Sequence, residues 1–338
     1  MQIKLFSRVW LIYFLLAFPS FYFVYKYGTT DLGIRDFVDY YKLYKDWDIT
    51  HVDAPFNMRL LSSFFVHLFY KAGLHYNTTI SFEKMSTLDK DVFFCAIFFN
   101  FLCITTTCSV IFFTIKKHFS NLLLSFSGGL IYLLGFGTLF YEFMPITDAC
   151  SILLFAICIH YYLSQSYLII IPLLLLVFQR EYIFLALAVL AVMDFWKYRL
   201  KYFLYILLTC GFCFIIYFIL RKTVFYTPLY DRQASPAYFL DSIFHLKFPL
   251  APYIKQTLMT MNIFFIYLLL LIYKKIKKLE IDSFGFMKVL LLFVQINVIS
   301  VAAVFGNNTG RYFYILIPFV IFQLVKETDP LFRNIVKT

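Results

Sequence analysis

The run from Tyr167 to Phe195 is almost entirely apolar, yet Arg180 and Glu181 lie next to each other in its middle. A charged residue at the centre of a membrane-spanning helix costs roughly 2.5–3.5 kcal/mol, so two of them there should have a purpose. As one helix, the run would reach about 45 Å, well beyond a bilayer core of about 30 Å. We therefore expect two short helices, 167–178 and 182–196, that meet at these two charges.

Composition places the chain among helical membrane proteins. Hydrophobic residues make up 62% of it and charged residues only 14%, whereas a soluble domain carries about 25% charged residues. Lipid cannot satisfy backbone polar groups, so the long apolar stretches must be helices or a closed barrel, and they lack the alternation of a barrel. We predict an all-α fold, a polytopic transmembrane bundle that forms a single domain over residues 1–338. About ten spans are expected, namely Val9–Val24, 92–115, 120–141, 147–163, 167–178, 182–196, 202–220, 257–273, 286–305 and 312–325.

Basic residues between the spans predict the orientation of the chain. With an even number of spans and a cytoplasmic N-terminus, the basic loops all fall on the cytoplasmic side, as they do in most membrane proteins. Both termini are then cytoplasmic, and two long segments, 26–91 and 221–256, lie outside. We expect an integral protein of the bacterial inner (plasma) membrane, with membrane lipids as partners. The basic residues are Lys116, Lys117, Lys197, Arg199, Lys201, Lys274, Lys275, Lys277, Lys278, Lys326 and Arg333.

The formal net charge of +11 would suggest a nucleic-acid partner in a soluble protein. Here the basic residues fall mostly between spans, where they set the topology. We therefore predict no nucleic-acid binding.

In the first outer segment, Asp36 and Asp39 are three residues apart, which puts them on one face if the stretch is helical. Two carboxylates on one face can serve as a general base and as a metal or orienting ligand. The alternative is that they stabilise a helix N-terminus, where Asp is favoured.

Further along the same segment, residues 57–70 have an apolar face but are too short to span a bilayer. We expect an interfacial helix that lies on the membrane. Arg59 at its start would then be at the level of lipid headgroups, where the phosphate of a lipid carrier is found. Packing within the protein is the alternative for Arg59.

Three more charged positions fall at the ends of spans on the outer side. Asp148 begins a span after Glu142, at a helix N-terminus that favours an anion, a bound phosphate or a metal ion. Arg311 begins the last span at headgroup depth. The alternatives are a helix cap for Asp148 and an interfacial anchor for Arg311. Asp36, Asp39 and Asp148 could meet around a divalent cation, which prefers oxygen ligands, so a divalent cation stays open as a cofactor.

Taken in order, these motifs resemble a known family. They are Asp36 with Asp39-Tyr40, then Pro145-Ile146-Thr147-Asp148, then Gln179-Arg180-Glu181, and finally Arg311-Tyr312-Phe313-Tyr314. The chain is similar over most of its length to the GT-C class of integral-membrane glycosyltransferases, which use polyprenyl-phosphate sugars. It differs from many members of that class because its C-terminal tail ends soon after the last span.

The resemblance implies a role for each candidate residue. The catalytic carboxylate would be Asp36 or Asp39, and the phosphate of the polyprenyl-phosphate sugar donor would be held by Arg180 or Arg311. Arg59 is a further candidate for the phosphate, from its position, and Glu142, Asp148 and Glu181 would support the site. The acceptor would be a glycan or glycolipid hydroxyl on the outer face, and transfer would invert the anomeric centre.

Two other functions remain as alternatives. A transporter or flippase of a lipid-linked sugar would also use intramembrane charges and broken helices, but the two halves of the sequence show no internal repeat. A polysaccharide polymerase would share the basic outer surface.

Overall fold

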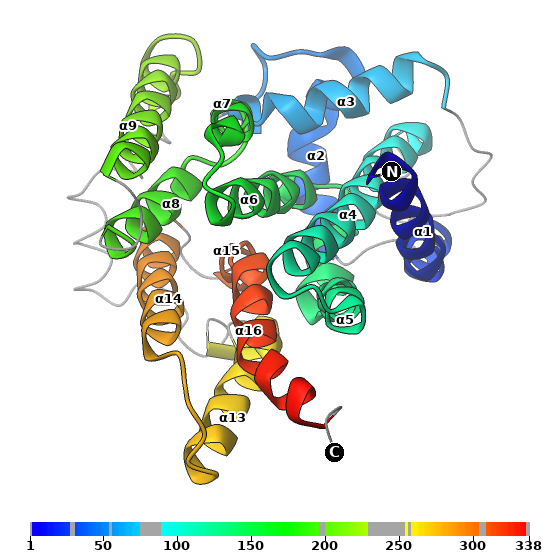
Figure 1. The fold of residues 1–338 in the computed structure, drawn as a ribbon. Helices are drawn as coiled ribbons and strands as arrows, with labels where there is room; N and C mark the ends of the chain where they lie inside the picture. The colour runs from blue at the N-terminus through cyan, green and yellow to red at the C-terminus, as the bar shows by residue number, and fades with distance from the viewer. Residues whose placement is uncertain are drawn as a thin grey trace.

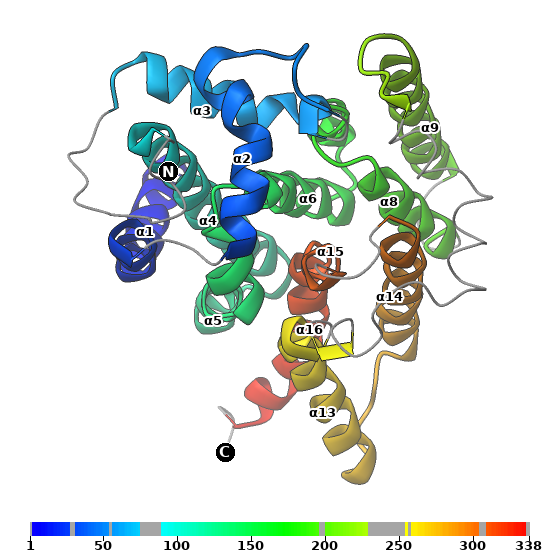
Figure 2. The same ribbon diagram turned by 180° about the vertical axis from the view of Figure 1, so that it is seen from behind.

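The computed structural model describes residues 2–27, 31–53, 56–74, 89–195, 200–228, 254–255, 258–303 and 309–335. In these residues all regular structure is helical, which confirms the all-α prediction (Figures 1 and 2). Among the described residues, three helices are long and apolar enough to cross a membrane. They are α1 (Gln2–Tyr27), α4 (Lys90–Phe119) and α9 (Leu200–Thr223).

Each of the other predicted spans contains a helix, but the expectation of about ten spans is not confirmed. For example, α5 has 12 residues, which is about 18 Å and well short of a bilayer core of about 30 Å. The remaining elements are α2 (Asp31–Asp46), η1 (Phe56–Met58), α3 (Leu60–Lys71), α5 (Leu122–Leu133), η3 (Thr138–Glu142), α6 (Asp148–Leu163), η4 (Tyr167–Ile169), α7 (Ile170–Leu176), α8 (Tyr182–Met193), α13 (Asn262–Ile276), α14 (Ser283–Ala303), α15 (Thr309–Tyr314) and α16 (Ile317–Ile335).

The long helix α4 forms the centre of the bundle. It packs against α1, α3, α5, α6 and α16 (Figure 1). Of its apolar window 72% is buried, against 22% for α1 and 28% for α9. The three long helices therefore differ in role, because α4 supplies the core while α1 and α9 expose most of their apolar side chains.

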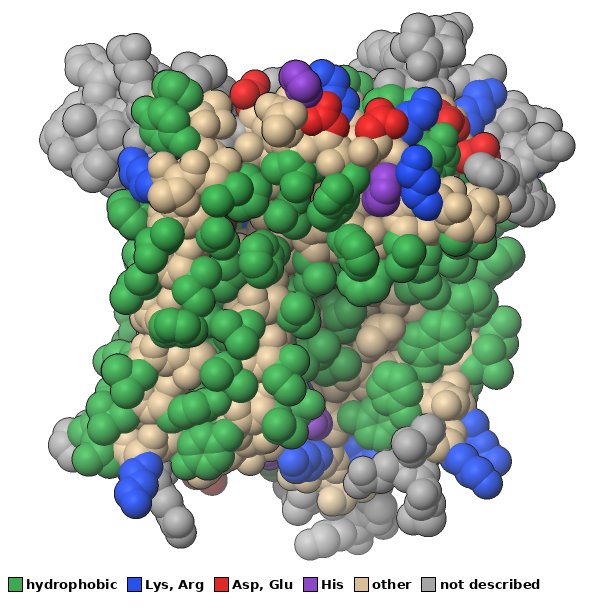
Figure 3. Space-filling model, turned by 90° about the horizontal axis from the view of Figure 1, so that it is seen from above, with side chains coloured by type: hydrophobic (Ala, Val, Ile, Leu, Met, Phe, Trp, Pro, Cys, Tyr) green, Lys and Arg blue, Asp and Glu red, His purple; other side chains and the backbone are tan. Residues whose placement is uncertain are grey.

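The exposed apolar side chains form a belt across one face of the molecule. Figure 3 shows hydrophobic side chains across the middle of one face, between two rims that carry the charged ones. Exposed fractions reach 62% for Leu15 on α1 and 72% for Leu208 on α9. Apolar surface this extensive is typical of a protein that is covered by lipid or by a partner.

The helices break at two places that shape the interior of the bundle. First, α7 ends at Leu176 and α8 begins at Tyr182, which confirms the predicted break at Arg180. Second, the predicted span 120–141 ends early, because the chain turns at Leu134 after α5. Gly137 lies against the ring of Tyr314 there, at a distance that leaves no room for a Cβ atom.

A pair of helical glycines provides a test of the packing. A Cβ atom at Gly129 on α5 would overlap the ring of Tyr13, whereas a Cβ at Gly211 on α9 would meet nothing within 4 Å. We expect Gly129→Ala to lower the free energy of unfolding by about 1–3 kcal/mol, the usual cost of overpacking. Gly211→Ala should raise it by about 0.5–1 kcal/mol through helix propensity alone.

Thermal unfolding of the two variants in detergent micelles measures the difference. Equal melting temperatures for the two variants would contradict this packing of α1 on α5.

Candidate functional site

An irregular segment inside the bundle, Phe143–Thr147, joins η3 to α6, and all of its residues are buried. Its carbonyl groups are satisfied by side chains of neighbouring helices. Asn100 Nδ2 on α4 donates hydrogen bonds to the carbonyl oxygens of Met144 (2.5 Å) and Ile146 (2.7 Å). Non-helical backbone is tolerated at such depth only where protein groups take the place of water. The position of α6 therefore depends on α4.

At the first residue of α6, Asp148 forms an ion pair with Arg180. Arg180 Nη2 lies 2.5 Å from Asp148 Oδ1, and the two side chains are only 2% and 6% exposed. The guanidinium group also lies over the rings of Tyr182 and Tyr312, at 6.0 and 5.6 Å from their centroids. The pair thus connects the α7–α8 break to the start of α6 and to α15.

A second buried arginine reaches the same place from the segment 26–91. Arg59, just before α3, donates a hydrogen bond from Nη1 to the hydroxyl of Tyr40 on α2. That hydroxyl lies 3.2 Å from Thr147 Oγ1, next to Asp148 in the chain. We call Tyr40, Arg59, Thr147, Asp148 and Arg180 the arginine network. It consists of two sets of buried polar contacts, Arg59–Tyr40–Thr147 and Arg180–Asp148, which are adjacent because Thr147 and Asp148 are neighbours in the chain.

Further hydrogen bonds hold the α7–α8 break against α3. Gln179 Nε2 donates to Ser62 Oγ, and the backbone N–H of Leu61 donates to the carbonyl of Phe178 at 3.3 Å. The chain just before Arg180 and just after Arg59 is therefore held by contacts other than those of the arginines themselves.

Glu142 belongs to a separate buried cluster at the end of η3. Its carboxylate accepts hydrogen bonds from the hydroxyl of Tyr132 and from Thr138 Oγ1, the second at 3.3 Å. Thr138 Oγ1 also lies 2.8 Å from the hydroxyl of Tyr314 on α15. Glu142 is fully buried, so it lies inside the bundle and not on an exposed outer turn. The hydroxyl of Tyr314 connects this cluster to α15, the same short helix that Arg180 contacts through Tyr312.

For the other predicted site residues, the structure describes the position in the fold but not in every case the side chain. Asp39 is an exposed side chain on α2, and Glu181 is half-buried just before α8. Asp36 lies on α2 and Arg311 on α15, but their side chains are outside the described residues. Within the described part of the chain, no three His, Cys, Asp or Glu side chains gather closely enough to hold a metal ion.

A partly exposed carboxylate, Asp48, follows α2 in the loop to η1. Asp48 accepts hydrogen bonds from Thr50 Oγ1 at 2.8 Å and from the backbone N–H groups of Thr50 and His51. The hydrogen bond from Thr50 and those from His51 lower the pKa of Asp48 to about 2. A carboxyl group with this pKa is ionised at neutral pH and is a weak base.

Sequence reasoning missed the residues that support the site. Asn100 was not selected, although an amide side chain among the aromatic residues of α4 is itself an unusual feature. Its amide meets carbonyl groups more than 40 positions away in the chain. Thr138 and Tyr132 were also missed, because no spacing in the sequence connects them with Tyr314.

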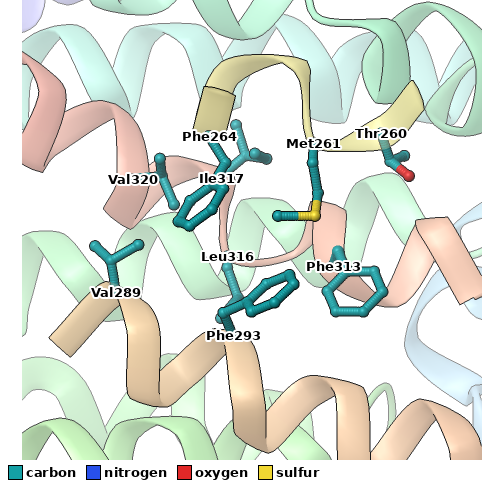
Figure 4. Close-up of a pocket in the computed structure, with 9 residues that line it drawn as sticks. All are labelled: Thr260, Met261, Phe264, Val289, Phe293, Phe313, Leu316, Ile317 and Val320. Atoms are coloured by element: carbon teal, nitrogen blue, oxygen red, sulfur yellow. The ribbon is translucent and has the colours of Figure 1, made fainter. Parts of the chain in front are cut away.

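A small apolar cavity lies on the other side of α15. It is lined by side chains of α13, α14, α15 and α16, among them Phe264, Phe293 and Phe313 (Figure 4). Its volume is about 20 Å³, enough for about one water molecule. This cavity is a gap in the packing, too small for a sugar.

Compared with models of protein families, with curated proteins and with solved structures, the chain has no match.

The burial of the ion pair leads to a prediction for its two members. Removing one partner leaves a buried charge uncompensated, which costs about 3–5 kcal/mol, whereas replacing both with apolar residues is far less costly. We expect Arg180→Met and Asp148→Leu each to destabilise the protein strongly, and the double variant to be more stable than either single variant.

A double-mutant cycle from unfolding in detergent measures this coupling. Lys45→Met is the control, because Lys45 is 3.6 Å from Asp89 in a partly exposed pair, which should contribute less than about 1 kcal/mol. If the double variant lost as much free energy of unfolding as the two single variants together, the ion pair between Arg180 and Asp148 would be contradicted.

Proposed function

We propose that this protein is an integral-membrane glycosyltransferase of the GT-C type, which moves a sugar from a polyprenyl-phosphate donor to an acceptor hydroxyl on the outer face. One observation carries the proposal. The four motifs that resemble the family are far apart in the sequence, yet Tyr40, Thr147, Asp148, Arg180 and Tyr312 connect them through buried contacts. A shared site explains why these segments converge.

The membrane location is supported by the three long apolar helices and by the apolar belt. In Figure 3 the upper rim mixes acidic, basic and histidine side chains, whereas the lower rim carries mainly Lys and Arg. The lower rim therefore suits the cytoplasmic side, with both termini there. On α3, Phe64 and Leu68 are exposed, which suits an interfacial helix on the outer side.

In the proposed reaction, a carboxylate of α2 acts as the general base. Asp36 or Asp39 would remove the proton from the acceptor hydroxyl as its oxygen attacks the anomeric carbon of the donor sugar. The bond from that carbon to the phosphate oxygen breaks at the same time, and attack from the opposite side inverts the centre. The polyprenyl phosphate leaves with the negative charge.

The arginine network would bind and stabilise the leaving phosphate. Guanidinium groups form strong, charge-assisted hydrogen bonds with phosphate oxygens. Arg59 and Arg180 belong to segments that meet at the start of α6, and Arg311 precedes Tyr312, whose ring contacts Arg180. The N-terminus of α6 adds its own partial positive charge. Asp148 would offset part of this charge and hold Arg180 in place, so we assign it a supporting role together with Glu142 and Glu181.

Tyr40 would also position the base. It follows Asp39 directly on α2, and its hydroxyl is fixed between Arg59 and Thr147. The same contacts that hold the arginines therefore set the distance between the carboxylates of α2 and the start of α6. A divalent cation bound by Asp36, Asp39 and Asp148 is a further part of this proposal, and a chelator tests it.

The proposal is tested by a transfer assay with the purified protein in lipid nanodiscs. Radiolabelled polyprenyl-phosphate sugars are the donors, a cell-envelope extract supplies the glycan acceptors, and the assay is run with Mg²⁺ and with a chelator. We expect label in the acceptor for the wild type. Asp36→Asn or Asp39→Asn, whichever carboxylate is the base, should lower the rate by about 10²–10⁴-fold.

Asp46→Asn is the matched control, because Asp46 is exposed at the C-terminal end of the same helix. It should leave the rate unchanged. Full activity of both the Asp36 and the Asp39 variants would exclude the catalytic role of α2. If labelled donor changes leaflet in sealed vesicles without any transfer, the protein is a transporter or flippase instead, and long labelled products would indicate a polymerase.

A further inference from the structure

The turn that joins α13 to α14 carries a cluster of lysine residues whose roles differ. Lys274 is buried and forms an ion pair with Glu327 on α16, and Asp282 at the end of the turn is paired with Lys326. The other three, Lys275, Lys277 and Lys278, are exposed. The carboxylates of Glu327 and Asp282 are thus paired with Lys274 and Lys326. Glu280 is a further exposed carboxylate on the turn, so three exposed lysines against one exposed glutamate leave a local excess of positive charge.

One of the exposed lysines is in a backbone conformation that normally favours glycine. Lys278 has a φ of 54° and closes α13 in a Schellman motif, in which Lys278 N–H donates to the carbonyl of Lys275 and Leu279 N–H to that of Lys274. Glycine is usual at this position because it has no Cβ atom. Lysine at a strained position suggests that its charge is used.

Apolar side chains surround the same turn. Ile272 and Ile276 on α13 are 55% and 73% exposed, and Phe284 on α14 is 47% exposed. Both ribbon views place the turn at the edge of the molecule, away from α4 (Figures 1 and 2). Lysines next to exposed apolar and aromatic side chains are typical of the boundary between lipid tails and headgroups. A binding site for a soluble anion would need the lysines but not the exposed apolar side chains.

We propose that the turn from Lys275 to Glu280 is a binding site for the headgroups of anionic phospholipids. The ammonium groups of Lys275, Lys277 and Lys278 bind the lipid phosphate, while Ile276 and Phe284 contact the acyl chains. The site fixes the α13–α14 hairpin, and with it α16, at the surface of the bilayer. This inference does not depend on the proposed glycosyl transfer.

Binding is tested with the purified full-length protein in a neutral detergent, so that topology in the cell plays no part. Phosphatidylglycerol is titrated while the melting temperature is followed, since a ligand that binds the folded state raises it. We expect a saturable rise with phosphatidylglycerol and none with phosphatidylcholine or inorganic phosphate. The variant with Lys275, Lys277 and Lys278 all changed to Gln should lose the rise, with affinity about fivefold weaker for each lysine removed.

The variant Lys278→Gly distinguishes the effect of the lysine charge on lipid binding from its effect on the stability of the fold. It relieves the strained φ, so its melting temperature without lipid should be higher than that of the wild type, while its affinity for phosphatidylglycerol should be lower. Gln165→Gly is the matched control, because Gln165 also has a positive φ, of 50°, but no charge. It should stabilise the protein and leave lipid affinity unchanged. An unchanged phosphatidylglycerol response in the triple Gln variant, or an equal response to inorganic phosphate, would overturn the proposal.

Discussion

The buried charge of Arg180 is the constraint on which the rest of the structure depends. An ionised guanidinium group inside an apolar bundle requires a paired anion and further polar or aromatic contacts, because the cost of an uncompensated charge there is several kcal/mol. Asp148 supplies the anion, and the guanidinium also contacts the rings of Tyr182 and Tyr312. Satisfying one residue therefore ties together the α7–α8 break, the start of α6 and the short helix α15.

The same requirement explains why the interior contains so much ordered polar structure. Broken helices leave backbone groups without helical partners, and in the absence of water other side chains must bind them. Asn100 on α4 does so for the carbonyl groups of Met144 and Ile146. In the α7–α8 break, the carbonyl of Phe178 accepts a hydrogen bond from the backbone N–H of Leu61 on α3, and Gln179 donates to Ser62 Oγ. The elements that carry the candidate catalytic residues are thus positioned by polar contacts across the bundle, with α4 as the common support.

Much of the local structure could be predicted from the sequence, but the contacts between residues of different helices could not. Long apolar runs predict helices, and the charges at Arg180 predict the break between α7 and α8. The length of α5 could not be predicted, because it ends where Tyr314, 177 positions beyond Gly137, packs against the chain. Lys274 was expected in a basic loop between spans, and the sequence did not predict that it is buried in α13 and paired with Glu327. The partners of Arg59 and Arg180 likewise lie on other helices, and their residue types alone do not identify them.

The central claim is that the arginine network at the start of α6 holds the phosphate of a lipid-linked donor. The most direct test is a cryo-EM map of the protein in nanodiscs that contain a polyprenyl-phosphate sugar with a non-transferable linkage. We predict phosphate density within hydrogen-bond distance of Arg59, Arg180 or Arg311, with the sugar facing Asp36 and Asp39 on α2. An ordered donor phosphate bound elsewhere, for example among the lysines between α13 and α14, would contradict the account.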